Sequence, residues 1–149
     1  MSGRRSTIRA GFGIVLSLVL VGCGSDKGLP KCSPVTGKVL VDGKPAVRAT
    51  VAFHPLAPQP DGKTYGASTF TDDTGEFWLT TFTAGDGAPA GDYTVTVVAN
   101  WLVKDGRDVS TPDLLKGQYA DPKTSPLKVT VREEPNALAP FDLKSSPKP

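Results

Sequence analysis

The sequence predicts an all-β protein, an antiparallel seven-strand β-sandwich preceded by an export signal. Glycine and proline supply 16 and 14 of the 149 residues, and so many chain breakers argue against a helical bundle. Several short segments alternate apolar and polar residues with period two, and turn-forming sequences separate them. With 38% hydrophobic and 21% charged residues, the chain suits one globular domain rather than a disordered protein.

Residues 1–22 have the composition of a signal peptide. Arg4, Arg5 and Arg9 are their only charged residues, and a mostly apolar stretch follows at 10–21. As a helix that stretch would rise about 18 Å, too short for a hydrocarbon core of about 30 Å. We therefore expect a cleaved export signal. The arginine pair leaves a twin-arginine route as the alternative, although the residues after it lack the usual aromatic or leucine pair.

The signal ends in Leu20-Val21-Gly22-Cys23, which resembles the bacterial lipobox. The resemblance implies cleavage between Gly22 and Cys23, a diacylglycerol on the Cys23 sulfur and an acyl chain on the new amino group. No other cofactor is expected. A glycine at position 24, where aspartate would favour inner-membrane retention, points to the outer membrane of the cell envelope. The alternative is an ordinary secretory signal with a cysteine nearby.

The formal net charge of +2 comes from the predicted signal. Removal of residues 1–22, which hold three arginines and no acidic residue, leaves 127 residues with 14 basic and 15 acidic side chains. The remaining chain has no basic patch or stripe in its sequence. We therefore expect no nucleic-acid partner.

After the lipidated cysteine and a polar tether at 23–33, the sandwich is expected over 34–143. Its strands are expected at 35–41, 46–53, 65–71, 76–81, 93–101, 127–131 and 139–143. In the first, Val35, Val39 and Val41 share one face. Asp42-Gly43 supplies the positive φ angles of a hairpin turn into the second strand.

The middle of the chain predicts another hairpin and the clearest strand. Residues 65–71 and 76–81 are expected to pair about the turn at 72–75. In 93–101, Tyr93, Val95 and Val97 face one way, and the threonines between them face the other.

The connection 102–126 is the longest, and long loops on a rigid sandwich are a common place for binding. It turns at 104–107 and is expected to hold one helical turn within 110–119, with Thr111 as N-cap. The strand at 127–131 alternates apolar and polar residues. The tail 144–149, rich in Ser, Pro and Lys, is expected to be disordered.

Three motifs together resemble the carboxypeptidase regulatory-like domain. They are Val35-Thr36-Gly37-Lys38-Val39 with Asp42-Gly43-Lys44-Pro45, Thr71-Asp72-Asp73-Thr74-Gly75-Glu76-Phe77, and Gly91-Asp92-Tyr93-Thr94-Val95. The segment from Tyr119-Ala120-Asp121-Pro122 onward resembles small planctomycete-type lipoproteins that carry this domain. The resemblance implies a transthyretin-like or Ig-like sandwich and carries no assigned activity.

Catalytic and metal-binding patterns are weak. His54 is the chain's only histidine, so a histidine-based zinc site is excluded, and a strand-end rim position is its simplest interpretation. Asp72, Asp73 and Glu76 are expected to serve a turn; a calcium site is the alternative, but it lacks the ligand spacing. No acid–base pair follows from the spacing of the carboxylates. We expect neither an enzyme nor a metal site.

Trp78 and Tyr119 are the candidate binding-surface residues. If Phe77 is in the core, alternation places Trp78 on the outer face, where the proline-rich loop 55–60 or the 102–126 connection is expected to cover it. The alternative is an exposed Trp78 that stacks on a sugar or a partner side chain. Cys32 in the tether is left free, oxidised or linked to a second chain, or bridged to Cys23 if Cys23 is not lipidated.

These observations predict a membrane-anchored envelope lipoprotein whose sandwich is a non-catalytic binding or accessory module. Its expected partners are the membrane, through the lipid, and an envelope protein or a glycan. The alternatives are a transthyretin-like small-molecule hydrolase and a periplasmic carrier of a metal, small ligand or glycan. The single His54 argues against the hydrolase, which would need several histidines and arginines in one cleft.

Overall fold

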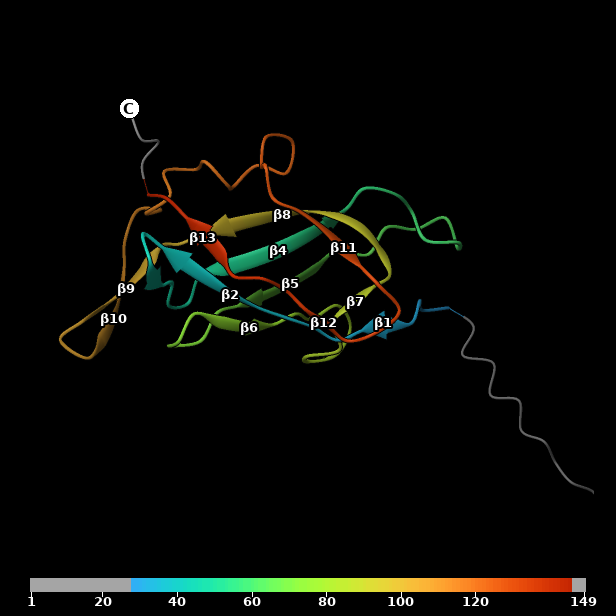
Figure 1. Ribbon diagram of the computed structural model, residues 1–149, viewed down its shortest axis with the longest axis horizontal. Coiled ribbons are helices and arrows are strands. Elements are labelled where there is room, and N and C mark those ends of the chain that lie inside the picture. The colour runs from blue at the N-terminus through green and yellow to red at the C-terminus, as the bar shows by residue number, and fades with distance from the viewer. Residues whose placement is uncertain (1–27, 146–149) are drawn as a thin grey trace, which may run out of the picture.

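Strands make up all the regular secondary structure of the described chain. The computed structural model describes residues 28–145 (Figure 1), and no helix occurs among them. The strands are β1 (Cys32–Ser33), β2 (Val35–Val41), β3 (Lys44–Pro45), β4 (Thr50–Pro55), β5 (Ala67–Phe70), β6 (Glu76–Trp78), β7 (Ala88–Pro89), β8 (Gly91–Val98), β9 (Trp101–Lys104), β10 (Arg107–Ser110), β11 (Lys128–Val131), β12 (Asn136–Ala137) and β13 (Phe141–Leu143).

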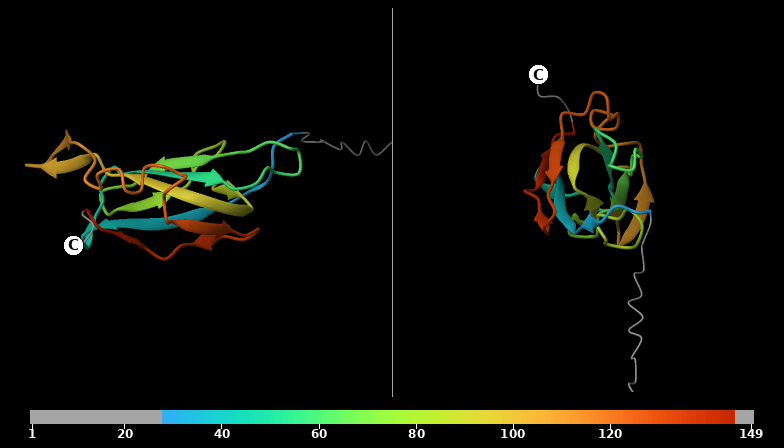
Figure 2. Two further views of the ribbon diagram at one scale, coloured as in Figure 1. Left: turned by 90° about the horizontal axis from the view of Figure 1, so that it is seen from above. Right: turned by 90° about the vertical axis from the view of Figure 1, so that its right-hand side faces the viewer.

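Two larger sheets form the sandwich. One is the antiparallel sheet β11-β8-β4-β5, and in the other β2 lies between β6 on one side and β12 and β13 on the other, with β3 paired to its end. The sheets pack face to face (Figure 2), and the rings of Phe53 on β4 and Phe77 on β6 meet across the core at 6.5 Å between centroids. Two small ribbons, β1–β7 and β9–β10, complete the fold. The predicted all-β sandwich is confirmed.

The core follows the predicted alternation in β2, β4 and β8. Val35 and Val39 of β2, Val51 of β4 and Val95 of β8 are each at most 1% exposed. The glycine in the middle of β2 has a packing role. A Cβ on Gly37 would lie 2.6 Å from the Phe77 ring, and Gly37 is the cross-strand partner of Phe77. The glycine thus leaves room for an aromatic ring to lie over the strand.

The first predicted turn is confirmed, but the strand after it begins later than expected. Asp42 and Gly43 have φ angles of 51° and 78°, and the short ladder that they close contains only two residue pairs, between β2 and β3. The chain then crosses to the other sheet through residues 46–49, with Arg48 at φ 52°. For that reason β4 starts at Thr50 rather than at 46.

The second predicted hairpin is wrong, because its arms belong to different sheets. β5 pairs with β4, and β6 pairs with β2. The two arms share a single isolated β-bridge, between Ser68 of β5 and Thr80, which follows β6. The turn at 72–75 is therefore an arch that carries the chain across the core. This path buries Phe77 completely between the sheets. Period-two alternation is the same for either pairing, so it cannot tell a hairpin from an arch.

The sandwich is also not purely antiparallel. β13 lies within the last predicted strand, 139–143, whereas β12 precedes that range, and both run parallel to β2. In addition, Cys32 and Ser33, expected in the tether, form β1 and pair with Pro89 and Ala88 of β7. Ser33 is only 4% exposed, so the folded part begins before residue 34.

The helical turn predicted within 110–119 does not form. Thr111 caps nothing; instead the Asp113 carboxylate accepts hydrogen bonds from the backbone N–H groups of Ala99, Leu115 and Gly117 at 2.8–3.1 Å. These bonds hold a series of turns that buries Leu115 completely. The end of the connection lies along β8, where the Val97 N–H donates to the Tyr119 carbonyl oxygen at 2.9 Å.

Candidate functional site

The two ends of the long axis differ in character. At one end lie β1, β7 and the loop 55–66, and the described chain begins there at Gly28. At the other end the β9–β10 ribbon projects from the body of the sandwich (Figure 1). The described chain therefore begins at the end opposite the projecting ribbon.

The β9–β10 ribbon exposes more apolar surface than a solvated hairpin needs. Leu102, Val103 and Val109 are 44%, 52% and 41% exposed. The ribbon is closed by Asp105 and Gly106, both with positive φ, the geometry of a two-residue hairpin turn. A two-stranded hairpin is only marginally stable by itself, and no third strand pairs with this one among residues 28–145.

Charges of one sign face each other beside this turn. Lys104 and Arg107 are direct cross-strand partners, and like charges in that position destabilise a ribbon. Neither side chain has an ion pair within residues 28–145. Next along the same face is the apolar pair of Leu102 and Val109. One face of the ribbon therefore combines an apolar base with a cationic tip.

A groove of about 790 Å³ runs beside β9. Its lining includes the apolar residues Val41, Ala46 and Leu114, and β9 contributes Trp101 through Val103. Mostly apolar grooves with a few polar groups at the rim are the usual form of binding sites.

One ion pair joins the ribbon to the sandwich. Arg48 Nε lies 2.5 Å from an Asp108 carboxylate oxygen on β10. Arg48 is held at φ 52°, a conformation that costs a non-glycine residue about 1–2 kcal/mol. Beside the pair, Phe70 is 65% exposed and shares a shallow hollow of about 610 Å³ with Trp101.

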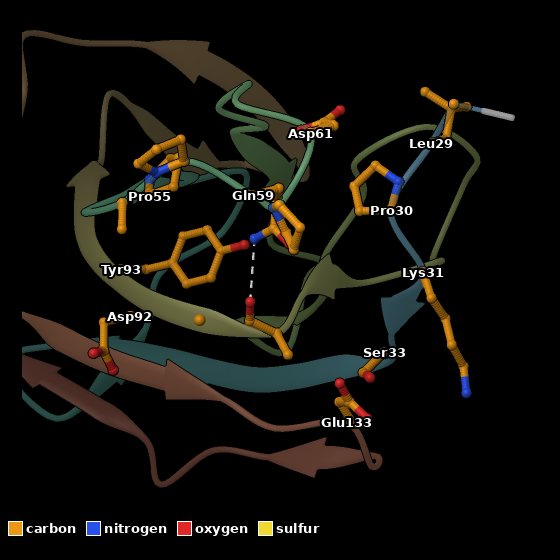
Figure 3. Close-up of a pocket in the computed structure, with 16 residues that line it drawn as sticks. Leu29, Pro30, Lys31, Ser33, Pro55, Gln59, Asp61, Asp92, Tyr93 and Glu133 are labelled. Carbon is orange, nitrogen blue, oxygen red and sulfur yellow. Dashed lines mark hydrogen bonds between the residues drawn. The ribbon is translucent and has the colours of Figure 1, made fainter.

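A second cavity, of about 600 Å³, lies at the opposite end, where the chain leads toward Cys23. Figure 3 shows Tyr93, Pro55 and Gln59 on one side of it and residues 29–31 on the other. Gln59 Nε2 donates to the Ala90 carbonyl oxygen at 3.2 Å and so ties the proline-rich loop to the strand entry. Burial raises the pKa of Tyr93 to about 12, and its hydroxyl donates to the Pro89 carbonyl oxygen.

The predicted binding-surface residues do not share a site. Trp78 is 52% exposed while Phe77 is fully buried, so the predicted alternation is confirmed and the expected cover by a loop is wrong. Trp78 lines a shallow hollow on the β2–β6 side. Tyr119 lies half-buried against the core, beside β8 of the other sheet.

His54 lies on the outer face of β4 and is partly buried. Its Nε2 is 2.9 Å from Thr96 Oγ1, and Lys128 Nζ donates to Thr94 Oγ1 at 2.6 Å. Both threonines, predicted on the face opposite Tyr93, Val95 and Val97, are 6% exposed or less. Long polar side chains from neighbouring strands cover them, which alternation along a single strand cannot reveal.

The acidic turn at 72–75 binds its own backbone. Asp72 Oδ1 accepts hydrogen bonds from the Thr74 N–H, the Thr74 hydroxyl and the Glu76 N–H at 2.8–2.9 Å. The Thr74 hydroxyl, more than the backbone N–H groups, holds the Asp72 pKa below its ordinary value. Within residues 28–145 no three His, Cys, Asp or Glu side chains group as metal ligands.

Asp86 organises the loop before β7 and faces Cys32. Its carboxylate accepts hydrogen bonds from the backbone N–H groups of Thr81, Phe82 and Thr83 at 2.7–3.0 Å. Desolvation raises the Asp86 pKa, but these bonds outweigh it, so the pKa lies below its ordinary value. Burial, followed by the Asp86 charge, raises the pKa of the Cys32 thiol.

We expect the contribution of Asp86 to the free energy of unfolding to depend on pH. Because its folded pKa is lowered, its contribution is complete above the unfolded pKa of about 3.9 and is lost as pH falls through the folded value. Urea unfolding at pH 7 should show Asp86→Asn to be less stable than the parent, and the gap should narrow by pH 3. A gap of the same size at both pH values would contradict this assignment.

The predicted signal peptide, the Gly22–Cys23 cleavage site and residues 146–149 of the tail lie outside the described residues. Within 28–145, no helix has the length and apolarity needed to cross a membrane.

Comparison with known proteins adds little to this geometry. No family model matches the chain, and no curated protein matches it. Among solved structures, it is similar to BcpA, the major pilin subunit of Bacillus cereus, at 15% identity and a TM-score of 0.45, covering 78% of this chain and 31% of BcpA. A 9R-lipoxygenase from Cyanothece PCC8801 aligns at 12% identity and a TM-score of 0.37, covering 76% of this chain and 16% of the lipoxygenase.

This chain thus spans less than a third of the length of either neighbour. Likeness at this level carries no argument about function.

The projecting ribbon is the feature that the sequence interpretation missed. The sequence predicts a loop over 102–126 after a strand that ends at 101, with a turn at 104–107 and one helical turn within 110–119, and it predicts no strand there. The signal was present, because Val103 and Val109 flank Asp105-Gly106, and a turn of that type between apolar residues indicates a hairpin.

Proposed function

We propose that this protein is a membrane-anchored lipoprotein of the cell envelope and that its sandwich is a non-catalytic binding or accessory module. The observation that carries the proposal is the placement of the two ends. The chain leads toward Cys23 from one end of the long axis, and the exposed β9–β10 ribbon lies at the other. A domain held at the first end would present the ribbon away from the lipid.

The anchor would act over a short distance. Four residues separate Cys23 from Gly28, and an extended chain spans at most about 3.6 Å per residue. The beginning of the sandwich would therefore stay close to the membrane. Two or three acyl chains would hold it firmly, because each buried methylene adds about 0.8 kcal/mol. We propose the outer membrane as the location because position 24 is glycine.

We further propose that the sandwich is a carboxypeptidase regulatory-like domain of the planctomycete lipoprotein type. Each of the three motifs that suggest it contains a place where the chain turns or enters a strand. The first covers β2 and the turn into β3, the second contains the arch at 72–75, and the third is the entry to β8. A non-catalytic role is supported by His54, the only histidine, whose ring is engaged by Thr96 on a sheet face.

The anchor is tested by exchanging each of the two cysteines separately. We expect wild-type protein, produced in a bacterium that processes lipoproteins, to incorporate an alkyne-labelled fatty acid and to sediment with membranes. Cys23→Ala should lose the label and leave the membrane fraction, because no thiol remains at the lipobox. Cys32→Ala is the matched control and should keep both properties. Label and sedimentation that persist in Cys23→Ala would overturn the proposal.

A further inference from the structure

One edge of the β9–β10 ribbon is an unfilled strand position. In an antiparallel ribbon closed by a two-residue turn, the flanking pair exchanges backbone hydrogen bonds, and so does every second pair beyond it. Here these are Lys104 with Arg107 and Leu102 with Val109, and the Thr111 N–H continues the series by donating to the Asn100 carbonyl oxygen at 2.8 Å.

The intervening residues of β9 therefore direct their backbone groups away from β10. Trp101 and Val103 present N–H and C=O groups to the outer edge, and neither has a backbone hydrogen bond there within residues 28–145. A row of unpaired backbone groups is a template for another strand.

The free edge adjoins a groove of suitable form. Trp101 and Val103 line the 790 Å³ groove, and the β2–β3 turn region and Leu114 also contribute to its lining. A strand added to β9 would place alternate side chains against this apolar surface. Backbone pairing would supply affinity, and the side-chain positions would supply selectivity.

Charge indicates what kind of strand would fit. Lys104 and Arg107 oppose each other on one face of the ribbon without an ion pair in the described chain, while Leu102 lies on that face two residues before Lys104. On a neighbouring strand, an apolar residue beside Leu102 would stand two positions from a residue beside Lys104. A carboxylate in the latter position would relieve the repulsion between the two cations.

The base of the ribbon holds further unsatisfied groups. Asn100 Oδ1 and Thr111 Oγ1 are both enclosed and have no hydrogen-bond partner in the described residues. Buried polar atoms are nearly always paired in folded proteins. Together with the like charges at the tip, they give the ribbon several unsatisfied groups in a small region, a pattern characteristic of functional sites.

We propose that β9 binds an extended, acidic segment of a partner protein, which adds to the free edge as a third strand and places a carboxylate beside Lys104 and Arg107. This rests on the proposed role as a binding module, and it names the chemistry of the partner. Side chains of the bound segment alternate between the two faces of the ribbon. On the face of Leu102 and Lys104, the segment has an apolar residue beside Leu102 and, two positions along, the acidic residue beside Lys104.

The test uses the full lipidated chain in detergent and two labelled octapeptides. Both have threonine at every second position. The positions between the threonines alternate valine with glutamate in one peptide and valine with lysine in the other. We expect saturable binding of the glutamate peptide by fluorescence anisotropy and about tenfold weaker binding of the lysine peptide. Hydrogen exchange at the Trp101 and Val103 amides should slow when the glutamate peptide is bound.

Two substitutions locate the binding edge. Val103→Pro removes an outward N–H without removing a hydrogen bond to β10, and proline is tolerated at such edge positions. This substitution should weaken binding of the glutamate peptide about tenfold. Ser110→Pro removes the equivalent group on the outer edge of β10 and should leave binding unchanged. The double variant Lys104→Glu with Arg107→Glu should reverse the preference and bind the lysine peptide more tightly. The reversal follows from the change of charge alone, with the fold retained.

Equal binding of both peptides, wild-type affinity in Val103→Pro, or no saturable binding would each overturn the proposal. So would a ribbon that instead binds anionic lipid vesicles, or that pairs with a second copy of the chain in sedimentation. Fractionation of the same preparations reports separately on the anchor. Peptide binding without membrane attachment would contradict only the lipoprotein proposal.

Discussion

Replacing Phe77 by alanine should cost about 3–5 kcal/mol of the free energy of unfolding. The side chain is fully buried, and its ring contacts come from both sheets, with centroid distances of 6.5 Å to Phe53 and 6.3 Å to Phe141. The space cannot collapse easily, because Gly37 beneath the ring has no side chain to move into it. Since small domains are stable by about 5–15 kcal/mol, urea unfolding should reveal a large shift of the midpoint.

The neighbouring tryptophan is the matched control. Trp78 is the next residue on β6 and larger than Phe77, but it is 52% exposed. Trp78→Ala should therefore change the unfolding free energy by less than about 1 kcal/mol. If the two substitutions cost the same, the assignment of inner and outer faces on β6 would be wrong.

Gly87→Ala should lower the unfolding free energy by about 3 kcal/mol and detach β1 from β7. Gly87 has a φ of 88°, and a Cβ there would lie 1.8 Å from the Ser33 carbonyl oxygen. No side-chain rotation can relieve a clash with backbone, so the start of the folded chain has to move. Release of β1 should also expose Cys32, whose thiol pKa is raised by burial in the parent.

The reactivity of Cys32 gives a local readout of this change. In a Cys23→Ala background Cys32 is the only cysteine, so its rate of alkylation can be followed directly and should rise in Gly87→Ala. Gly85→Ala is the control, because Gly85 also has positive φ, at 73°, but nothing lies within 4 Å of its added Cβ. It should cost only the conformational strain of about 1–2 kcal/mol and leave the alkylation rate unchanged.

In the proposed lipoprotein, the β1–β7 ribbon would carry any force between the lipid anchor and the sandwich. It is the first paired element of the described chain, and it joins the beginning of residues 28–145 to the loop that Asp86 organises. Any force on the anchor would reach the sandwich through this ribbon. Gly87 permits the close approach on which the ribbon depends.

Part of the candidate site was within reach of the sequence, and part was not. The Asp105-Gly106 turn is a recognisable hairpin signal, and the apolar residues that flank it are visible in the sequence. That the ribbon stands away from both sheets, and that its β9 edge borders a groove with Val41 and Leu114, depends on residues distant in the chain. Likewise, Trp78 could be placed on an outer face by alternation, whereas its lack of cover depends on where the loops pass.

The all-β class, the turn at Asp42-Gly43 and the inward faces of β2, β4 and β8 follow from the sequence alone. Each of these depends on neighbours within a few residues, because pleating alternates side chains and turn types demand particular φ angles. The arch at 72–75, the parallel pairing of β12 and β13 with β2 and the free edge of β9 are visible only in the folded chain. The ladder of backbone hydrogen bonds is nearly independent of side chains, so the choice of partner strand is made by packing across the whole core.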